Sequence, residues 1–122
     1  MSFFGALANL FSRSGRDDNL LRQAMEHAKS NRPAKAIESY SALVGSKSTS
    51  TMVRSRALVN RALAYSSMKD DKKAIADLEE VLAMTGVSEN VTVAARTQLV
   101  RVQNRTERQR ARVESAQSKK VR

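Results

Sequence analysis

Few side chains in this sequence could perform catalysis. His27 is the only histidine, the chain has no cysteine, and its four glycines form no phosphate-binding loop. A general base or a nucleophile needs a positioned partner, and the sequence places none beside His27. The lack of cysteine also excludes disulfides and thiolate metal sites. We therefore expect no enzymatic activity and no cofactor.

Asp70-Asp71 and Glu79-Glu80 are adjacent acidic pairs, and carboxylates are potential metal ligands. Neighbouring side chains on a helix point in different directions, so such a pair does not converge on one metal ion. We interpret the first pair as a helix cap and the second as a solvated surface.

An internal repeat determines the elements that carry these residues. Residues 20–44 align without a gap with residues 58–82, at an offset of 38. The aligned positions are mostly small or apolar, and they pair Leu20 with Leu58, Ala24 with Ala62, His27 with Tyr65, Ala36 with Ala74, and Ile37 with Ile75. Repeats of this length are typical of solenoids, whose units bury their apolar faces by stacking. The alignment with Tyr65 also predicts that His27 is a packed residue and not a base.

The pattern of each copy predicts two helices, and a fifth helix is predicted after the second copy. In the first copy Asp17 or Asp18 can cap one helix, and Asn31 with Pro33 opens another that Gly45 ends. The second copy repeats the plan around a cap at Asp70 or Asp71. Small residues at positions 24, 36, 62 and 74 allow close helix approach. After Ser88, apolar residues at positions 91, 95, 99 and 102 predict the last helix. Strand signals are absent, so the fold class is all-α.

The stretch Asn60-Arg61-Ala62-Leu63-Ala64-Tyr65, followed by a short turn and Lys73-Ala74-Ile75, resembles the tetratricopeptide repeat. The usual period of that repeat is about 34 residues, and a loop at residues 45–51 fits the extra length. The resemblance implies a right-handed α-solenoid of two repeats and a C-terminal capping helix, over residues 17–104. It also implies a non-catalytic scaffold or adaptor that binds other proteins.

The resemblance further implies that the first helix of each pair lines a concave groove. It places nine residues there: Leu21, Arg22, Met25, Arg56, Val59, Asn60, Leu63, Arg96 and Val100. The floor of such a groove is apolar and its sides are cationic. It suits an extended segment or a helix whose apolar anchors lie between acidic residues.

Residues 1–14 form a separate amphipathic segment. Its large apolar residues lie on one face of a helix: Phe3, Phe4, Leu7, Leu10 and Phe11. This face can dock on the repeats of its own chain, exchange between two chains in a homodimer, or lie on a membrane surface. We expect a cytoplasmic protein, with import into an organelle left open by this segment.

The net charge of +10 is concentrated at the C-terminal end. The basic extension, residues 105–122, contains Arg105, Arg108, Arg110, Arg112, Lys119 and Lys120. Because the apolar stripe fades after Val102, we expect this end to project into solvent or become polar coil, with doubtful order from Ser115. A solubilising role is the simplest interpretation. The alternative is an adaptor that binds nucleic acid weakly and non-specifically through phosphate contacts.

Overall fold

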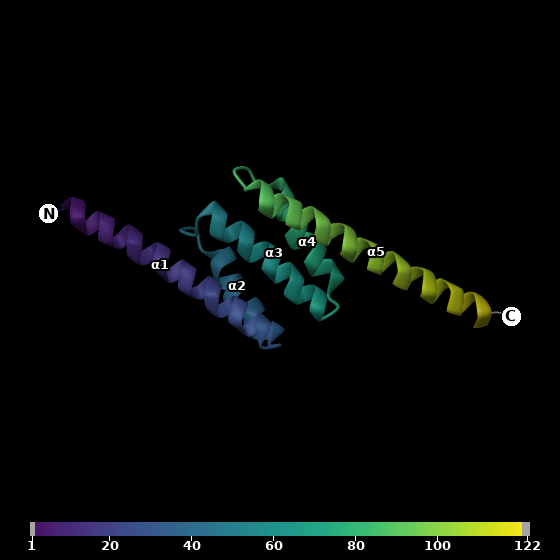
Figure 1. Ribbon diagram of the computed structural model, residues 1–122. Coiled ribbons are helices and arrows are strands. Elements are labelled where there is room, and N and C mark those ends of the chain that lie inside the picture. The colour runs from purple at the N-terminus through teal and green to yellow at the C-terminus, as the bar shows by residue number, and fades with distance from the viewer. Residues whose placement is uncertain (1, 121–122) are drawn as a thin grey trace.

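Five helices make up the described part of the chain, which comprises the backbone of residues 2–120 and the side chains of residues 15–120 in a computed structural model (Figure 1). They are α1 (Ser2–Lys29), α2 (Pro33–Gly45), α3 (Thr51–Ser67), α4 (Asp71–Ala83) and α5 (Glu89–Lys120). No strand occurs between residues 2 and 120. The prediction of an all-α array is confirmed.

The two short turns between paired helices have the same backbone geometry. Asn31 and Lys69, which lie 38 residues apart, both adopt left-handed conformations with φ of 60° and 62°. The next residue in each turn donates its N–H back to the end of the helix, from Arg32 to the His27 carbonyl at 2.8 Å and from Asp70 to the Tyr65 carbonyl at 2.9 Å. Such bonds satisfy carbonyls that a helix end leaves unpaired. The repeat therefore extends to the hydrogen bonds of the turns.

Two side-chain caps and a proline explain where three helices begin. Ser50 accepts a hydrogen bond from the N–H of Val53 at 3.2 Å at the start of α3. Asp70 accepts one from the N–H of Lys73 at 3.3 Å before α4, which confirms one of the two predicted caps. Pro33 is the first residue of α2, where its missing N–H costs nothing.

The two terminal helices are longer than the sequence patterns predicted. The expectation that Asp17 or Asp18 caps the first helix is wrong, because α1 continues through both residues from Ser2. Gly15 alone does not interrupt it. At the other end α5 continues as a helix to Lys120, so polar coil, one of the two expected outcomes beyond Val102, does not occur before that residue. Residues 103–120 contain no Gly or Pro and are rich in good helix formers, which explains the continuation.

The helices pack in two layers. Each helix contacts the next along the chain, and α3 also contacts α1 and α5. Figure 1 shows α1, α3 and α5 side by side, with α2 and α4 behind them. The first helices of successive pairs therefore share one face of the array.

Two adjoining clusters of buried residues form the core. The first contains Leu21, Ala24, Ala36, Tyr40, Leu43, Val53 and Ala57. The second contains Leu58, Val59, Ala62, Ala74, Leu78, Val81, Ala95 and Val102, and Val44 packs against both. The four alanines at positions 24, 36, 62 and 74 are essentially inaccessible to solvent. This burial agrees with the predicted place of all four between packed helices.

Candidate binding groove

One stripe of α3 faces the space between α1 and α5. Met52, Arg56, Asn60 and Leu63 recur at steps of four, four and three residues, so they lie along one side of the helix. Leu63 retains 41% of its accessible surface and Met52 retains 56%. The α3 helix therefore presents apolar side chains to solvent on the shared face of the array.

Two hollows flank this stripe and meet at Asn60. The hollow toward α5 has a volume of about 270 Å³ and is lined by Arg56, Val59, Asn60, Asn90, Val91 and Ala94. The hollow toward the α1–α2 turn has a volume of about 230 Å³ and is lined by Ala28, Asn31, Pro33, Tyr40, Asn60, Leu63, Ala64 and Ser67. We call the two hollows and the α3 stripe between them the groove.

The predicted apolar floor divides into exposed and buried residues. Met25 on α1 is 41% exposed, as is Leu63. Leu21 and Val59 are buried in the two core clusters, although Val59 also reaches the lining of the hollow toward α5. Met25 and Leu63 can contact a partner directly, whereas Leu21 acts mainly as support for α1.

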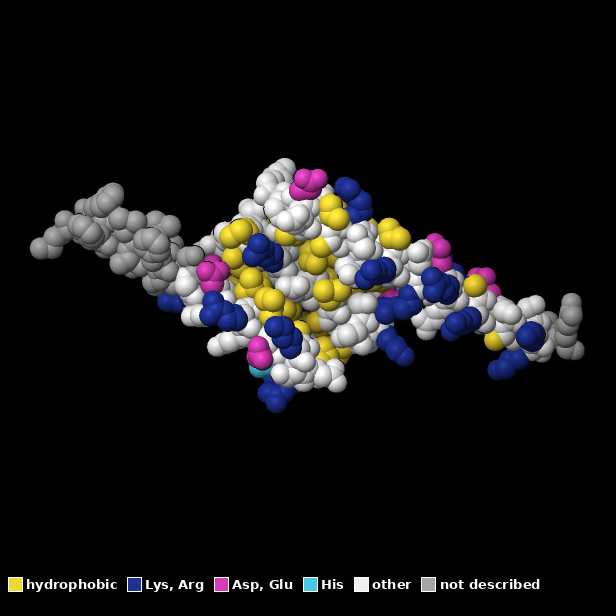
Figure 2. Space-filling view, in the orientation of Figure 1, with side chains coloured by type: hydrophobic (Ala, Val, Ile, Leu, Met, Phe, Trp, Pro, Cys, Tyr) yellow, Lys and Arg dark blue, Asp and Glu magenta, His cyan; other side chains and the backbone are white. Residues whose placement is uncertain are grey.

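Exposed arginines lie on two of the helices beside the groove, Arg56 on α3 and Arg22 on α1. Arg22 and Arg56 are exposed, and neither forms an ion pair with any residue between 15 and 120. Figure 2 views this face and shows apolar side chains gathered over α1, α3 and α5, with Lys and Arg side chains dispersed among them. Apolar and cationic side chains therefore share this face of the array.

Two predicted groove residues lie elsewhere. Arg96 and Val100 line a separate shallow hollow on α5 with Val93, Thr97 and Arg101. The α5 residues that reach the α3 stripe are instead Asn90, Val91 and Ala94. Ala95 and Val102 are buried in the core, and Arg96 and Val100 project from the opposite side of the helix. The orientation of α5 against α4 thus separates this pair from the groove.

A buried ion pair holds the helices behind the groove. Arg61 on α3 donates to both carboxylate oxygens of Asp77 on α4, at 2.8 and 2.6 Å, and to Ser41 Oγ on α2 at 3.1 Å. The hydrogen bonds to Asp77 raise the pKa of Arg61 above its ordinary value. Arg61 also lies 5.7 Å from the centre of the Tyr65 ring, within cation–π range. The sequence contained one signal for this pair, since Asp77 stands on the same face as the buried Ala74 and Val81.

The other candidate catalytic groups have structural or solvent-exposed positions. His27 is partly buried, and no residue in the described part of the chain hydrogen-bonds to its imidazole. Glu79 and Glu80 are exposed, as predicted. Among residues that the structure describes, no group of three or more His, Asp or Glu side chains could hold a metal ion. Within the same residues, no helix is long and apolar enough to cross a membrane.

The ends of the chain carry the remaining predicted sites. The side chains of residues 3–11 lie outside the described residues, so the docking of Phe3, Phe4, Leu7, Leu10 and Phe11 stays a prediction. At the other end Arg105 pairs with Asp71 and also donates to the hydroxyl of Ser66 at 3.0 Å. The other basic residues of the extension are exposed on α5.

Among residues 15–120, Asp71 is the carboxylate that forms an ion pair with this extension. Burial raises its pKa, but the hydrogen bonds from Arg105 and Thr106 more than offset that effect, so the pKa lies below its ordinary value. The Thr106 hydroxyl donates to Asp71 at 2.9 Å. These hydrogen bonds join α5 to the first residue of α4.

The comparisons with known proteins identify one repeat. The tetratricopeptide repeat family matches residues 55–86, which comprise most of α3, all of α4 and the following turn. No curated protein and no solved structure significantly matches the chain. The matched segment includes the whole second copy of the internal repeat. Residues 55–86 therefore match one tetratricopeptide repeat, and they lie within an all-α array of the kind that such repeats build.

Proposed function

We propose that this chain is a non-catalytic adaptor that binds a segment of a partner protein in the groove. The observation that carries this proposal is the stripe of α3, on which Arg56, Asn60 and Leu63 lie between two hollows. Tetratricopeptide repeats act as protein-interaction modules, and a solenoid of this kind offers an extended surface for a partner. The groove supplies such a surface beside the matched repeat.

The chemistry of the groove favours a partner with both apolar and acidic residues. Leu63 offers an apolar contact in the lining of the hollow toward the α1–α2 turn, and Met25 offers another on α1. Arg22 and Arg56 are exposed cations, and Asn60 can donate and accept hydrogen bonds where the two hollows meet. A peptide whose apolar anchors alternate with Asp or Glu would satisfy all of these groups.

Selection from a random peptide display library tests the proposal on the intact chain. We expect the selected peptides to contain apolar anchors next to acidic residues. Their affinity, measured by isothermal titration calorimetry, should fall about tenfold or more in Leu63→Glu, because that change places a charge against the apolar anchor.

Met68→Glu is the matched control. Met68 is 51% exposed and lies at the end of α3, outside the lining of both hollows. The control should retain affinity within about twofold, as expected for a change outside the contact. Equal losses in Leu63→Glu and Met68→Glu, or peptides that bind neither hollow in NMR chemical-shift mapping, would contradict the groove as the binding site.

A further inference from the structure

In the C-terminal half of α5, the cations other than Arg110 lie toward one side of the helix. Arg105, Arg108, Arg112 and Lys119 follow one another at steps of three, four and seven residues, which places them along one face. Glu107 and Glu114 lie on roughly the opposite face, again seven residues apart. The helix therefore presents a cationic edge instead of an evenly mixed surface.

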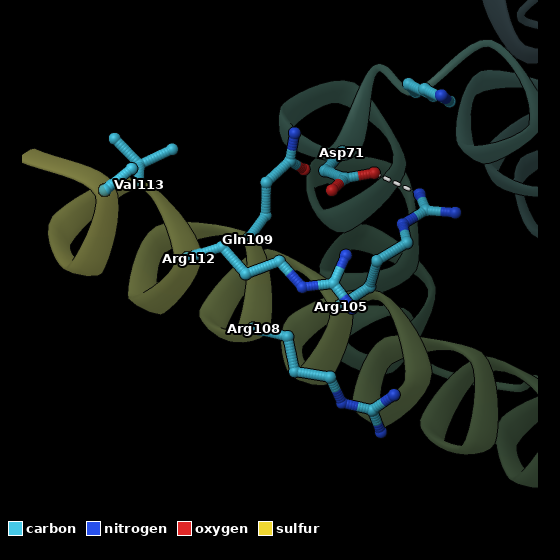
Figure 3. Close-up of a pocket in the computed structure, with 8 residues that line it drawn as sticks. Asp71, Arg105, Arg108, Gln109, Arg112 and Val113 are labelled. Atoms are coloured by element: carbon cyan, nitrogen blue, oxygen red, sulfur yellow. Dashed lines mark hydrogen bonds and ion pairs between the residues drawn. The ribbon is translucent and has the colours of Figure 1, made fainter.

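A hollow with a volume of about 510 Å³ lies beside this edge, where α5 passes the α3–α4 turn (Figure 3). Its lining consists of Lys69, Asp71, Arg105, Arg108, Gln109, Arg112, Val113 and Ala116. We call it the cationic hollow. Figure 3 shows Arg105 directed at Asp71 and Arg108 directed away from that carboxylate. The hollow thus has one neutralised arginine and further cations around it.

Three cations of the hollow are not neutralised by the protein. Lys69, Arg108 and Arg112 form no ion pair with any carboxylate of residues 15–120, and all three are exposed. The single carboxylate in the lining, Asp71, is already occupied by Arg105 and Thr106. The hollow therefore has a net positive charge that an acidic partner would balance.

The floor of the hollow lies on the same face of α5 that packs on α4 closer to the core. Along α5, Val102 is buried against α4, and Thr106 meets Asp71, the first residue of α4. The same face continues at steps of three and four residues through Gln109, Val113 and Ala116. Val113 is 51% exposed. This face of α5 extends for about three turns past the level of Asp71. No described helix covers that part of α5.

We propose that an acidic amphipathic helix of a partner protein binds along the C-terminal half of α5, in line with α4. Its apolar residues pack on Val113 and Ala116, and its Asp or Glu residues pair with Lys69, Arg108 and Arg112. The 15 residues from Thr106 to Lys120 span about 21 Å, which matches a bound helix of about four turns.

The lining distinguishes such a helix from a nucleic acid. Phosphate backbones are bound by charge and polar groups, and they do not use apolar residues such as Val113 and Ala116. Stacking of bases requires exposed aromatic side chains, and the residues that line the hollow include none. This site is separate from the groove, so the proposal stands without the function proposed above.

The test uses a fluorescent peptide of about 18 residues, long enough for the four turns, with Leu at every third or fourth position and Glu and Ala elsewhere. Fluorescence anisotropy should show that it binds the intact chain and gains helicity by circular dichroism. Arg112→Glu should weaken binding about tenfold, because it replaces an attraction by a repulsion. Val113→Ser should weaken it several-fold, because apolar contact is lost.

Arg110→Glu is the matched control, since it makes the same change in charge two residues away on the other side of α5. Arg110→Glu should change the affinity for the peptide by less than about threefold, because the altered charge does not face the bound peptide and is screened by salt. Leu63→Glu, in the groove, should leave binding of this peptide intact. Circular dichroism melts confirm that each variant remains folded.

Three results would overturn the proposal. Equal losses in Arg110→Glu and Arg112→Glu would show attraction to the net charge of the chain instead of a site. Loss in Leu63→Glu with retention in Arg112→Glu would place the peptide in the groove. If a DNA duplex of about 20 base pairs displaces the peptide and its own binding depends on Arg112 but not on Val113, the hollow binds phosphate backbones.

Discussion

Breaking the Arg61–Asp77 pair should destabilise the array more than any surface change on α4. The side chains of Arg61 and Asp77 are only 17% and 6% exposed, and their two hydrogen bonds join α3 to α4. Removing one partner of a buried ion pair costs about 3–5 kcal/mol. Because Arg61 keeps some exposure and its bond to Ser41, we expect about 3 kcal/mol for Asp77→Ala, near the lower limit.

A thermal melt followed by circular dichroism measures this loss. For a domain of roughly 100 residues, 3 kcal/mol corresponds to a decrease in Tm of about 12 °C. Glu79→Ala removes an exposed carboxylate from the same helix and should change stability by less than about 0.5 kcal/mol. The double variant Arg61→Met with Asp77→Leu should recover much of the loss, because an apolar pair avoids the desolvation cost of the ions. A Tm for Asp77→Ala within about 2 °C of the unaltered chain would refute this reasoning.

Three further changes test the packing and the turns. Ala62→Leu should overpack the α3–α4 contact and cost about 1–3 kcal/mol in a urea melt, whereas Ser118→Leu on the exposed end of α5 should leave the melt unchanged. Lys69→Gly should raise stability by about 0.5–1 kcal/mol, since it relieves a left-handed backbone at φ 62°; an unchanged or lower Tm would count against that strain. Asp71→Asn should destabilise the chain at neutral pH. Because the folded pKa of Asp71 is lowered, this difference should disappear as the pH falls below about 4, and a pH-independent difference would contradict the pairing with Arg105.

Local signals in the sequence were sufficient for the helices of the two repeats. Pro33 begins α2, Asp70 caps α4, and small residues at four aligned positions fill the closest contacts between helices. These features depend on neighbours along the chain or on a periodicity that the internal repeat shows twice. The ends of α1 and α5 were less predictable, because the fading of an apolar stripe indicates where packing stops and not where the helix stops.

The groove illustrates the limit of an alignment between repeats. The sequence placed Arg56, Asn60 and Leu63 on one face of α3, and the structure brings all three to the hollows. It also suggested Arg96 and Val100, but the rotation of α5 against α4 turns Asn90, Val91 and Ala94 toward α3 instead. The exposed Met52 was missed, although its position four residues before Arg56 places it on the same stripe.

The sequence by itself determined the repeat, the all-α class, the helix turns and the excess of positive charge, because each follows from residue type and spacing along the chain. Only the tertiary structure decided which charges meet. Arg61 pairs with Asp77, 16 residues away in the sequence, and Arg105 pairs with Asp71, 34 residues away. Arg108 and Arg112 have no carboxylate partner in the described part of the chain. The physical reason is that pairing depends on how helices rotate and cross when their apolar faces pack, and spacing within a single helix does not specify that rotation.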